Sequence, residues 1–274
     1  MNENIISYKR YEQLKKGEDK NHDEILYGIL KELIDKPERF IGVFNDLSLE
    51  ENLLAFVFRS SQSKQGSRYE EIVTEIIKNL GYEILPKIVY REGNKIRKVD
   101  QFFIKDKTLY IVEQKMSDDL DSNNKRAAYN RFNQKQLDVI KKYPNYEVKA
   151  YFWYLNDDLK KNQNYFNGKM EENSECFQEL IYGEDFFIKV LNSPEAWKEL
   201  ISHQIKFKNK RKPFKLPKNF DTNKKVLKSL LRLKEKEPKL FKKLYSDTPV
   251  YNEIRKKLFP TGQNLKLALN AEEE

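Results

Sequence analysis

The feature that most limits the fold of this chain is a change of hydrophobic period at Gly81. Before it, residues 67–80 carry apolar side chains at helical spacing, which predicts an amphipathic helix that ends at the glycine. After it, segments 82–90, 98–104 and 109–115 are short, rich in β-branched and aromatic residues, and separated by polar turns, as strands are. A long helix capped near Asp121 or Ser122 and a buried strand over 148–155 follow. This order of helix, three strands, helix and strand predicts a mixed α/β core with one layer of sheet.

Helical patterns flank this core on both sides. A stripe from about His22 ends at Pro37, a more buried helix covers 53–58, and the polar run 60–67 reads as a link to the core. Further helical segments are expected around 177–180 and 185–191, and the pattern from Asp221 onward is helical and basic. We therefore predict three regions: an N-terminal helical region over 1–66, the core with its following helices over 67–200, and a basic helical region over 201–274.

Composition excludes several classes of protein. No apolar run approaches the length of a membrane span, and no basic stretch followed by an apolar one marks a signal peptide. The single cysteine, Cys176, excludes a disulfide scaffold and a cysteine-based zinc finger. Two histidines, His22 and His203, leave little for histidine-based catalysis, and His203 and Cys176 are expected to be structural. We expect a soluble cytoplasmic protein, without a membrane partner, that works with carboxylates and lysines.

Positive charge is concentrated near the C-terminus. Residues 204–258 hold 19 Lys and Arg against 5 Asp and Glu, whereas the whole chain has a net charge of +9. Such a segment on an otherwise mildly acidic chain favours a polyanionic partner, most commonly nucleic acid. An AT-rich coding sequence would also raise the number of lysines, although it would not cluster them.

The stretch that carries chemistry is the predicted hairpin around Lys105-Asp106-Lys107-Thr108. If Asp106 and Lys107 form the turn, Lys105 pairs with Thr108, and Asp100 then lies opposite Glu113. Directly opposed residues have Cβ atoms about 4.5–5.5 Å apart, close enough for two carboxylates to share one Mg²⁺ ion.

Strand alternation places the side chains of Glu113 and Lys115 on one face and that of Gln114 on the other. The arrangement suits phosphodiester hydrolysis, in which a divalent ion polarises the phosphate and a lysine orients water or stabilises charge. An acid two residues before a lysine is by itself a common pattern, and an ordinary solvated strand face with a Glu–Lys pair would also produce it. Glu113 stands out because an apolar strand leads into it and an earlier strand offers Asp100 in register.

At these residues the chain resembles the PD-(D/E)xK nuclease superfamily, and specifically the type II restriction endonucleases. The resemblance covers the α-β-β-β-α-β core of about residues 67–155, with Asp100, Glu113 and Lys115 at the positions of the family motif. Val99 stands where many members have proline. More specific than the motif are the block from Glu113 to Arg126 (EQKMSDDLDSNNKR), which is similar to a block of one restriction-enzyme subgroup, and the segment Tyr182-Gly183-Glu184-Asp185-Phe186-Phe187.

The resemblance implies a Mg²⁺-dependent, site-specific hydrolysis of double-stranded DNA, with Asp100 and Glu113 as metal ligands and Lys115 assisting. It further implies a ligand role for the backbone carbonyl of Gln114 and for Glu70, although a glutamate near a helix start also suits the helix dipole. A homodimer is expected because two strands are cut, together with a DNA methyltransferase encoded alongside. The alternatives are a repair or transposition-type nuclease with the same core, and a non-catalytic basic DNA-binding protein.

Further residues are candidates for metal or DNA contacts. Asp118, Asp119 and Asp121 could bind metal, but capping and loop order are favoured. The candidates for DNA contact lie on the helix after the site and in the basic region, where a solvated helix face is the other reading: Lys125, Arg126, Arg131, Gln134, Lys210, Arg211 and Lys212.

Overall fold

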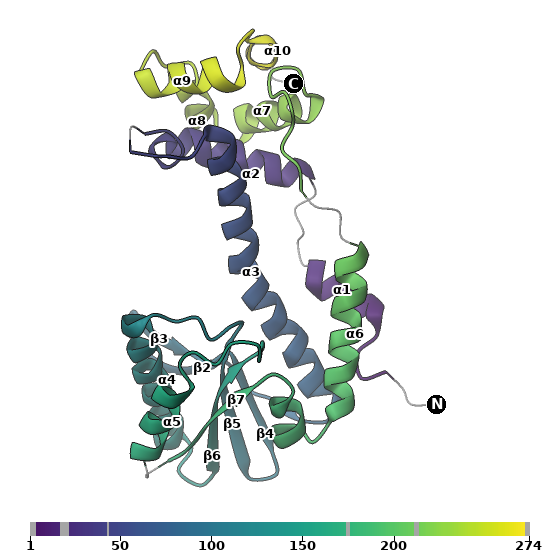
Figure 1. Ribbon diagram of the computed structural model, residues 1–274, viewed down its shortest axis with the longest axis vertical. Helices are drawn as coiled ribbons and strands as arrows, with labels where there is room; N and C mark the ends of the chain where they lie inside the picture. Colours follow the sequence, from purple (N-terminus) through teal and green to yellow (C-terminus); the bar gives the residue numbers. More distant parts are fainter. Residues whose placement is uncertain (1–3, 17–21, 43, 174–175, 211–213, 272–274) are drawn as a thin grey trace. The chain divides into compact units, whose positions relative to one another are not determined.

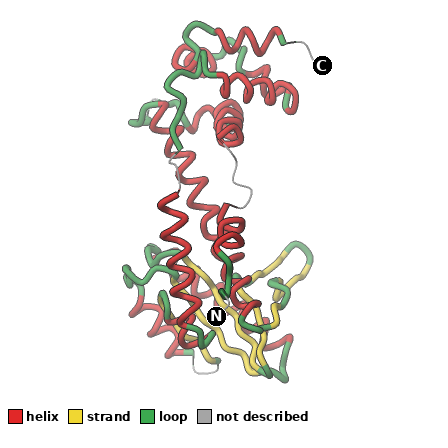
Figure 2. Tube along the Cα trace, turned by 90° about the vertical axis from the view of Figure 1, so that its right-hand side faces the viewer, coloured by secondary structure: helices red, strands yellow, loops and turns green. Residues whose placement is uncertain are grey.

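The structure is a computed structural model that describes residues 4–16, 22–42, 44–173, 176–210 and 214–271. It consists of two compact units, each built from separate stretches of chain. The first, here called the nuclease unit because it holds the residues of the predicted nuclease core, contains residues 1–17 and 65–211, and the second, the helical unit, contains residues 18–64 and 212–274. Every strand among the described residues belongs to the nuclease unit, and Figure 2 draws these strands in yellow. The three predicted regions stay a prediction. The two compact units group the chain differently, because the helical unit combines residues 18–64 with residues 212–274.

A mixed five-stranded sheet forms the centre of the nuclease unit, and its strands are ordered β1-β4-β5-β6-β7 (Figure 1). Strands β1, β4 and β5 are antiparallel, whereas β6 and β7 run parallel to β5. The five strands are β1 (Glu83–Ile84), β4 (Gln101–Lys105), β5 (Thr108–Lys115), β6 (Glu147–Tyr154) and β7 (Phe177–Tyr182). A separate two-stranded sheet contains β2 (Ile88–Glu92) and β3 (Lys95–Lys98). The predicted α/β fold with a mixed sheet is confirmed.

Alternating side chains give the main sheet two apolar faces. Phe103, Val112 and Trp153 pack in one cluster with the helix before the strands, and their neighbours Phe102 and Phe152 pack in another with the helix after β5. The first face is covered by α3 (Leu49–Asn79), α6 (Pro194–Lys210) and the π-helix η2 (Phe186–Val190), and α1 (Tyr8–Lys16) packs on α6. The second face is covered by α4 (Ser122–Lys142) and α5 (Gln163–Glu172). The sheet is therefore the middle of three layers.

Two predicted elements are wrong. The polar run 60–67 is not a link, because α3 is one continuous helix of 31 residues that passes through it. Segment 177–180 is not helical but belongs to β7, where it pairs in parallel with β6. The predicted segment 82–90 is interrupted between β1 and β2, because its second half pairs in the separate hairpin.

Other predicted features of the chain are confirmed. Helix α3 ends just before Gly81, which has a left-handed φ of 84°. The side chain of Asp121 caps α4 by accepting hydrogen bonds from the amides of Asn123 and Asn124. His203 is buried, and its Nε2 lies 2.8 Å from the carbonyl of Ile6, in keeping with a structural role.

The helical unit has its own apolar core, formed mainly by leucine, isoleucine and phenylalanine side chains. Its elements are α2 (His22–Asp35), the 3₁₀ turn η1 (Pro37–Arg39), the first part of α3, α7 (Lys224–Lys236), α8 (Pro238–Lys243), α9 (Pro249–Leu258) and α10 (Gln263–Asn270). Among the described residues, no helix is long and apolar enough to cross a membrane.

Candidate active site

The candidate site lies where β4 begins and β5 ends. The observed register pairs Lys105 with Thr108 and Gln101 with Val112, which confirms the predicted hairpin alignment. Asp100 directly precedes β4, and its amide donates to the carbonyl of Val112, so this residue lies beside Glu113. The backbone amide of Gln114 donates to Asp100 Oδ2 at 2.8 Å and fixes that carboxylate against the neighbouring strand.

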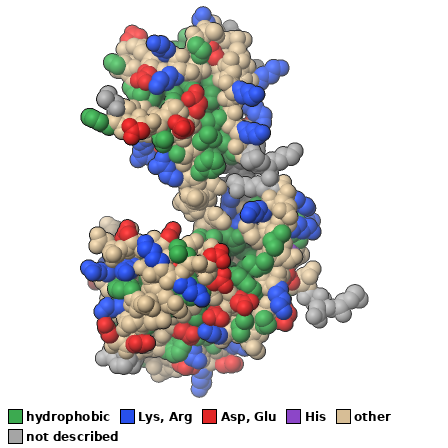
Figure 3. Space-filling view, in the orientation of Figure 1, with side chains coloured by type: hydrophobic (Ala, Val, Ile, Leu, Met, Phe, Trp, Pro, Cys, Tyr) green, Lys and Arg blue, Asp and Glu red, His purple; other side chains and the backbone are tan. Residues whose placement is uncertain are grey.

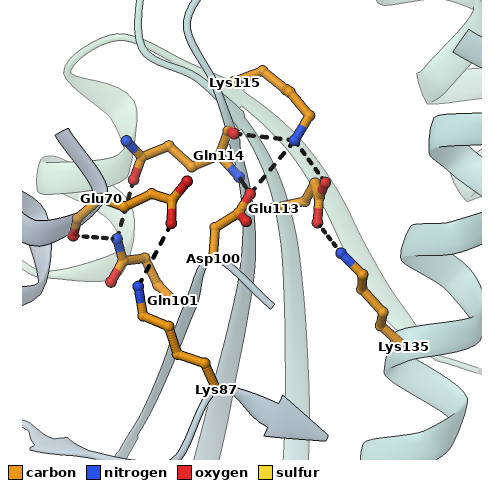
Figure 4. A network of polar contacts seen from close by, with 8 residues as sticks. All are labelled: Glu70, Lys87, Asp100, Gln101, Glu113, Gln114, Lys115 and Lys135. Carbon is orange, nitrogen blue, oxygen red and sulfur yellow. Dashed lines mark hydrogen bonds and ion pairs between the residues drawn. The ribbon is translucent and has the colours of Figure 1, made fainter. Parts of the chain in front are cut away.

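The ammonium of Lys115 contacts three oxygen atoms of this site (Figure 4). Its Nζ lies 2.6 Å from Glu113 Oε1, 3.5 Å from Asp100 Oδ2 and 3.2 Å from the carbonyl oxygen of Gln114. The three acceptors are the two carboxylates and the backbone carbonyl that the sequence had placed around one cation. The geometry therefore brings Asp100, Glu113, Gln114 and Lys115 together as expected.

A second lysine, Lys135 of α4, holds the other oxygen of Glu113. Its Nζ lies 2.6 Å from Glu113 Oε2, and both side chains are largely buried, at 13% and 12% exposed. Lys135 is not among the site residues predicted from the sequence. Its position in the sequence could have indicated it. The buried stripe of α4 contains Ala128, Phe132 and Val139, and Lys135 falls within this stripe at helical spacing.

Burial and charge act against each other at these groups. Burial raises the pKa of Asp100, and the neighbouring Glu113 carboxylate raises it further. Burial also acts to raise the pKa of Glu113, but Lys115 and Lys135 outweigh it and hold that pKa below its ordinary value. For Lys115 burial acts to lower the pKa, and attraction to Glu113 and Asp100 raises it on balance. At neutral pH the site therefore holds ionised glutamate between two ammonium groups.

Glu70 reaches the edge of this cluster from α3. Its carboxylate lies 3.7 Å from the ammonium of Lys87, and Figure 4 shows both side chains beside Asp100. Burial raises the pKa of Glu70, and the Asp100 carboxylate contributes in the same direction. The three carboxylates of Glu70, Asp100 and Glu113 thus share one electrostatic environment.

A buried amide network supports the site from the opposite face of the sheet. Gln101 Nε2 donates to the side-chain oxygen of Gln114 at 3.1 Å and to the backbone carbonyl of Glu70 at 2.9 Å. Thr74 donates to Gln101 Oε1 at 2.7 Å. Since Gln101 and Gln114 are 1% and 6% exposed, these bonds tie α3, β4 and β5 into one rigid frame.

Two acidic side chains of the loop after β5 form hydrogen bonds that stabilise the loop and the start of α4. Asp118 is completely buried and accepts hydrogen bonds from the amide and side chain of Asn162 and from the hydroxyl of Tyr182. Asp121 is the cap of α4, and Asp119 is exposed. Capping and loop order therefore account for Asp118 and Asp121.

The candidates for DNA contact that the structure describes are spread over the nuclease unit. On α4, Arg126, Arg131 and Gln134 are exposed, whereas Lys125 lies over the ring of Tyr165 at 4.8 Å from its centroid. Lys210 is exposed near the end of α6. Arg211 and Lys212 lie outside the described residues.

The donor set fits a hard divalent cation. No group of three or more His, Cys, Asp or Glu side chains able to hold a metal ion occurs within the described part of the chain. Here the donors are two carboxylates and one backbone carbonyl, which already surround a positive charge, and oxygen donors are what Mg²⁺ prefers.

An α-β-β-β-α-β core that gathers an aspartate, a glutamate and a lysine at the end of its central hairpin defines a nuclease of the PD-(D/E)xK type. Residues 82–208, which include all three side chains, match the family model described as "Type II restriction endonuclease, HinfI". This match, over just under half of the chain, supports a type II restriction endonuclease of this type and hence a site-specific deoxyribonuclease. The search of curated proteins found no match.

Proposed function

We propose that this endonuclease cleaves double-stranded DNA in a Mg²⁺-dependent reaction at the site formed by Asp100, Glu113 and Lys115. The observation that supports the proposal is the convergence of two carboxylate oxygens and the Gln114 carbonyl within 3.5 Å of one ammonium nitrogen. A position that attracts one positive charge so closely is suited to a divalent ion.

Each residue has a distinct task in this proposal. Asp100, Glu113 and the carbonyl of Gln114 hold the ion, and Glu70 supplies a further carboxylate at the edge. Bound there, Mg²⁺ would polarise the scissile phosphate and lower the pKa of a water molecule. The Lys115 ammonium orients the attacking water or stabilises the negative charge that develops on the phosphate.

Cleavage of plasmid DNA tests this assignment. The parent protein is incubated with unmethylated plasmid in Mg²⁺ or in EDTA, beside Glu113→Ala and Lys115→Ala. Discrete fragments from the parent in Mg²⁺ alone, with a loss of at least about a hundredfold in both variants, are expected. Lys107→Ala, in the exposed β4–β5 turn, is the matched control and should cut normally. Undiminished cutting by Glu113→Ala would refute the assignment.

The wider setting follows from the reaction. We propose that two copies of the chain act as a homodimer, because one site per chain faces two strands of a duplex. A companion methyltransferase would protect the same sequence in the cytoplasm, and sedimentation on cognate duplex tests the dimer. The basic side chains Lys125, Arg126, Arg131, Lys210, Arg211 and Lys212, together with Gln134, are proposed DNA contacts.

A further inference from the structure

The two-stranded sheet formed by β2 and β3 stands apart from the main sheet, directly before the candidate site. Asp100 follows the end of β3 at Lys98 by two residues, and Lys87, just before β2, contacts Glu70. Figure 2 shows the paired strands and their turn projecting from the nuclease unit. The hairpin is therefore tied to the chemistry at both of its ends.

One face of this hairpin is anchored to α4. Arg97 forms two hydrogen bonds with the carboxylate of Asp138, one of them 2.8 Å long, and its guanidinium stacks over the ring of Tyr90 at 3.8 Å. The side chains of Arg97 and Asp138 are only 17% and 9% exposed. This pairing holds the hairpin in one orientation, so that it can meet a ligand without further ordering.

The side chains on the opposite face form no hydrogen bond or ion pair with any residue that the structure describes. Because residues alternate along a strand, Ile96 and Lys98 point away from Arg97, and Arg91 lies opposite Ile96 in the register. Arg91 and Lys98 are exposed, and Ile96 is 44% exposed although it is apolar. We call these three residues the outer face of the hairpin.

Charge over this region suits a polyanion. The segment 87–98 contains three lysines and two arginines against one glutamate, and Figure 3 shows basic side chains, with acidic ones among them, at the left of the nuclease unit. The turn is closed by Gly93, whose φ of 53° lets the strands reverse without bulk at the tip. A narrow, basic, two-stranded ribbon fits the major groove of B-DNA, which is about 12 Å wide.

We propose that the β2–β3 hairpin is the arm that reads DNA in the major groove beside the cleaved bond. Arg91 and Lys98 grip phosphates at the groove walls, and Ile96 contacts base edges, where an apolar side chain favours a thymine methyl group. From Asp100 to the tip at Gly93 the strand extends about 20 Å, which covers roughly six base pairs on one side of the cut. This inference rests on the proposed function of the Asp100 site.

Two double variants test the grip on phosphate. Arg91→Ala/Lys98→Ala is compared with Lys105→Ala/Lys107→Ala, which removes the same charge from exposed positions at the end of β4 and in the β4–β5 turn. The probes are a duplex carrying the cut site, identified by sequencing plasmid fragment ends, and a scrambled duplex, both in Ca²⁺ at several salt concentrations. We expect the hairpin variant to bind at least tenfold more weakly and its salt slope to fall by about two, with no change in the control.

Ile96→Ser tests base reading. We expect about a three- to tenfold loss of preference for the cut site over single-base changes within six base pairs of the cut, with an unchanged salt slope. All three residues are exposed, so equal unfolding midpoints should show intact folding. The proposal that the hairpin reads DNA is refuted if the double hairpin variant binds like the control and Ile96→Ser keeps the full preference for the cut site. Failure of the parent protein to cut DNA would instead refute the proposed function. The two failures can be distinguished, because the salt dependence of binding to the scrambled duplex can be measured without cleavage.

Discussion

Lys135 offers the sharpest test of how the site is held. Its ammonium lies 2.6 Å from Glu113 Oε2, with both groups largely buried. Removing one partner of a buried ion pair costs about 3–5 kcal/mol in general. Glu113 keeps a second ion pair with Lys115, so we expect Lys135→Met to cost less, about 2–3 kcal/mol, which is at or just below the lower limit of that range.

The same substitution should slow the reaction. Without Lys135, nothing described holds Oε2 of Glu113, and its carboxylate is free to rotate toward Lys115. A displacement of about 1 Å in a catalytic group costs up to a hundredfold in rate. We therefore expect a ten- to hundredfold loss of single-turnover cleavage, with DNA affinity changed less than threefold.

The assay pairs thermal unfolding with single-turnover cleavage of a short cognate duplex. For a unit of this size, a loss of 2–3 kcal/mol lowers the melting midpoint by about 5–10 °C. Lys141→Met, exposed on the same helix, is the matched control, and Lys135→Arg should retain most activity because it keeps the charge. A lower melting midpoint with an unchanged cleavage rate would mean that Lys135 has only a structural role. If neither the melting midpoint nor the cleavage rate changes, the proposed role of the Lys135–Glu113 ion pair is refuted.

Three further perturbations probe the frame, the charge and the helical unit. Gln101→Leu should leave the buried side-chain oxygen of Gln114 without its donor, costing about 1–3 kcal/mol in urea unfolding and slowing cleavage; unchanged stability would contradict the network. Glu70→Gln leaves the cluster one unit more positive, so DNA binding should tighten severalfold in low salt while cleavage slows, as gel-shift and single-turnover assays would detect. At Asp221, burial acts to raise the pKa, but hydrogen bonds from Thr261 and its neighbours hold it below its ordinary value. Its stabilisation of about 1–3 kcal/mol is present above pH about 3.9 and is lost as the pH falls through the folded pKa, so Asp221→Asn should destabilise at pH 7 and do so progressively less as the pH falls below about 3.9.

Local signals in the sequence were enough to place the β4–β5 hairpin of the candidate site. The two-residue turn at Asp106-Lys107 sets the register, and a register error of one residue would have moved Glu113 to the opposite face of the sheet. Asp106 has a left-handed φ of 55°, a conformation that aspartate adopts more readily than most residues. The position of Asp100 beside Glu113 therefore follows from local chemistry.

Features that depend on distant contacts could not be predicted in this way. Segment 177–180 is too short to separate a helical from a strand period, and its pairing with β6 decides the matter. The run 60–67 contains one glycine and no proline, so its polar residues are compatible with a helix once both ends of α3 are packed. Lys135 was not predicted because a lysine in a helix is normally exposed to solvent. Its burial depends on the ion pair with Glu113 of the facing strand, which the local sequence does not show.

One strand therefore joins two kinds of support at the site. On one face of β5, Glu113 and Lys115 meet the lysine of α4, and on the other face Gln114 is held by Gln101 and through it by α3. The carbonyl of Gln114 belongs to the residue between the two charged ones, so its position depends on packing that contains no charge. The ionic contacts set the charge of the site, whereas the buried amides set the place of its third oxygen, because rotation of that peptide would break the bonds on the opposite face.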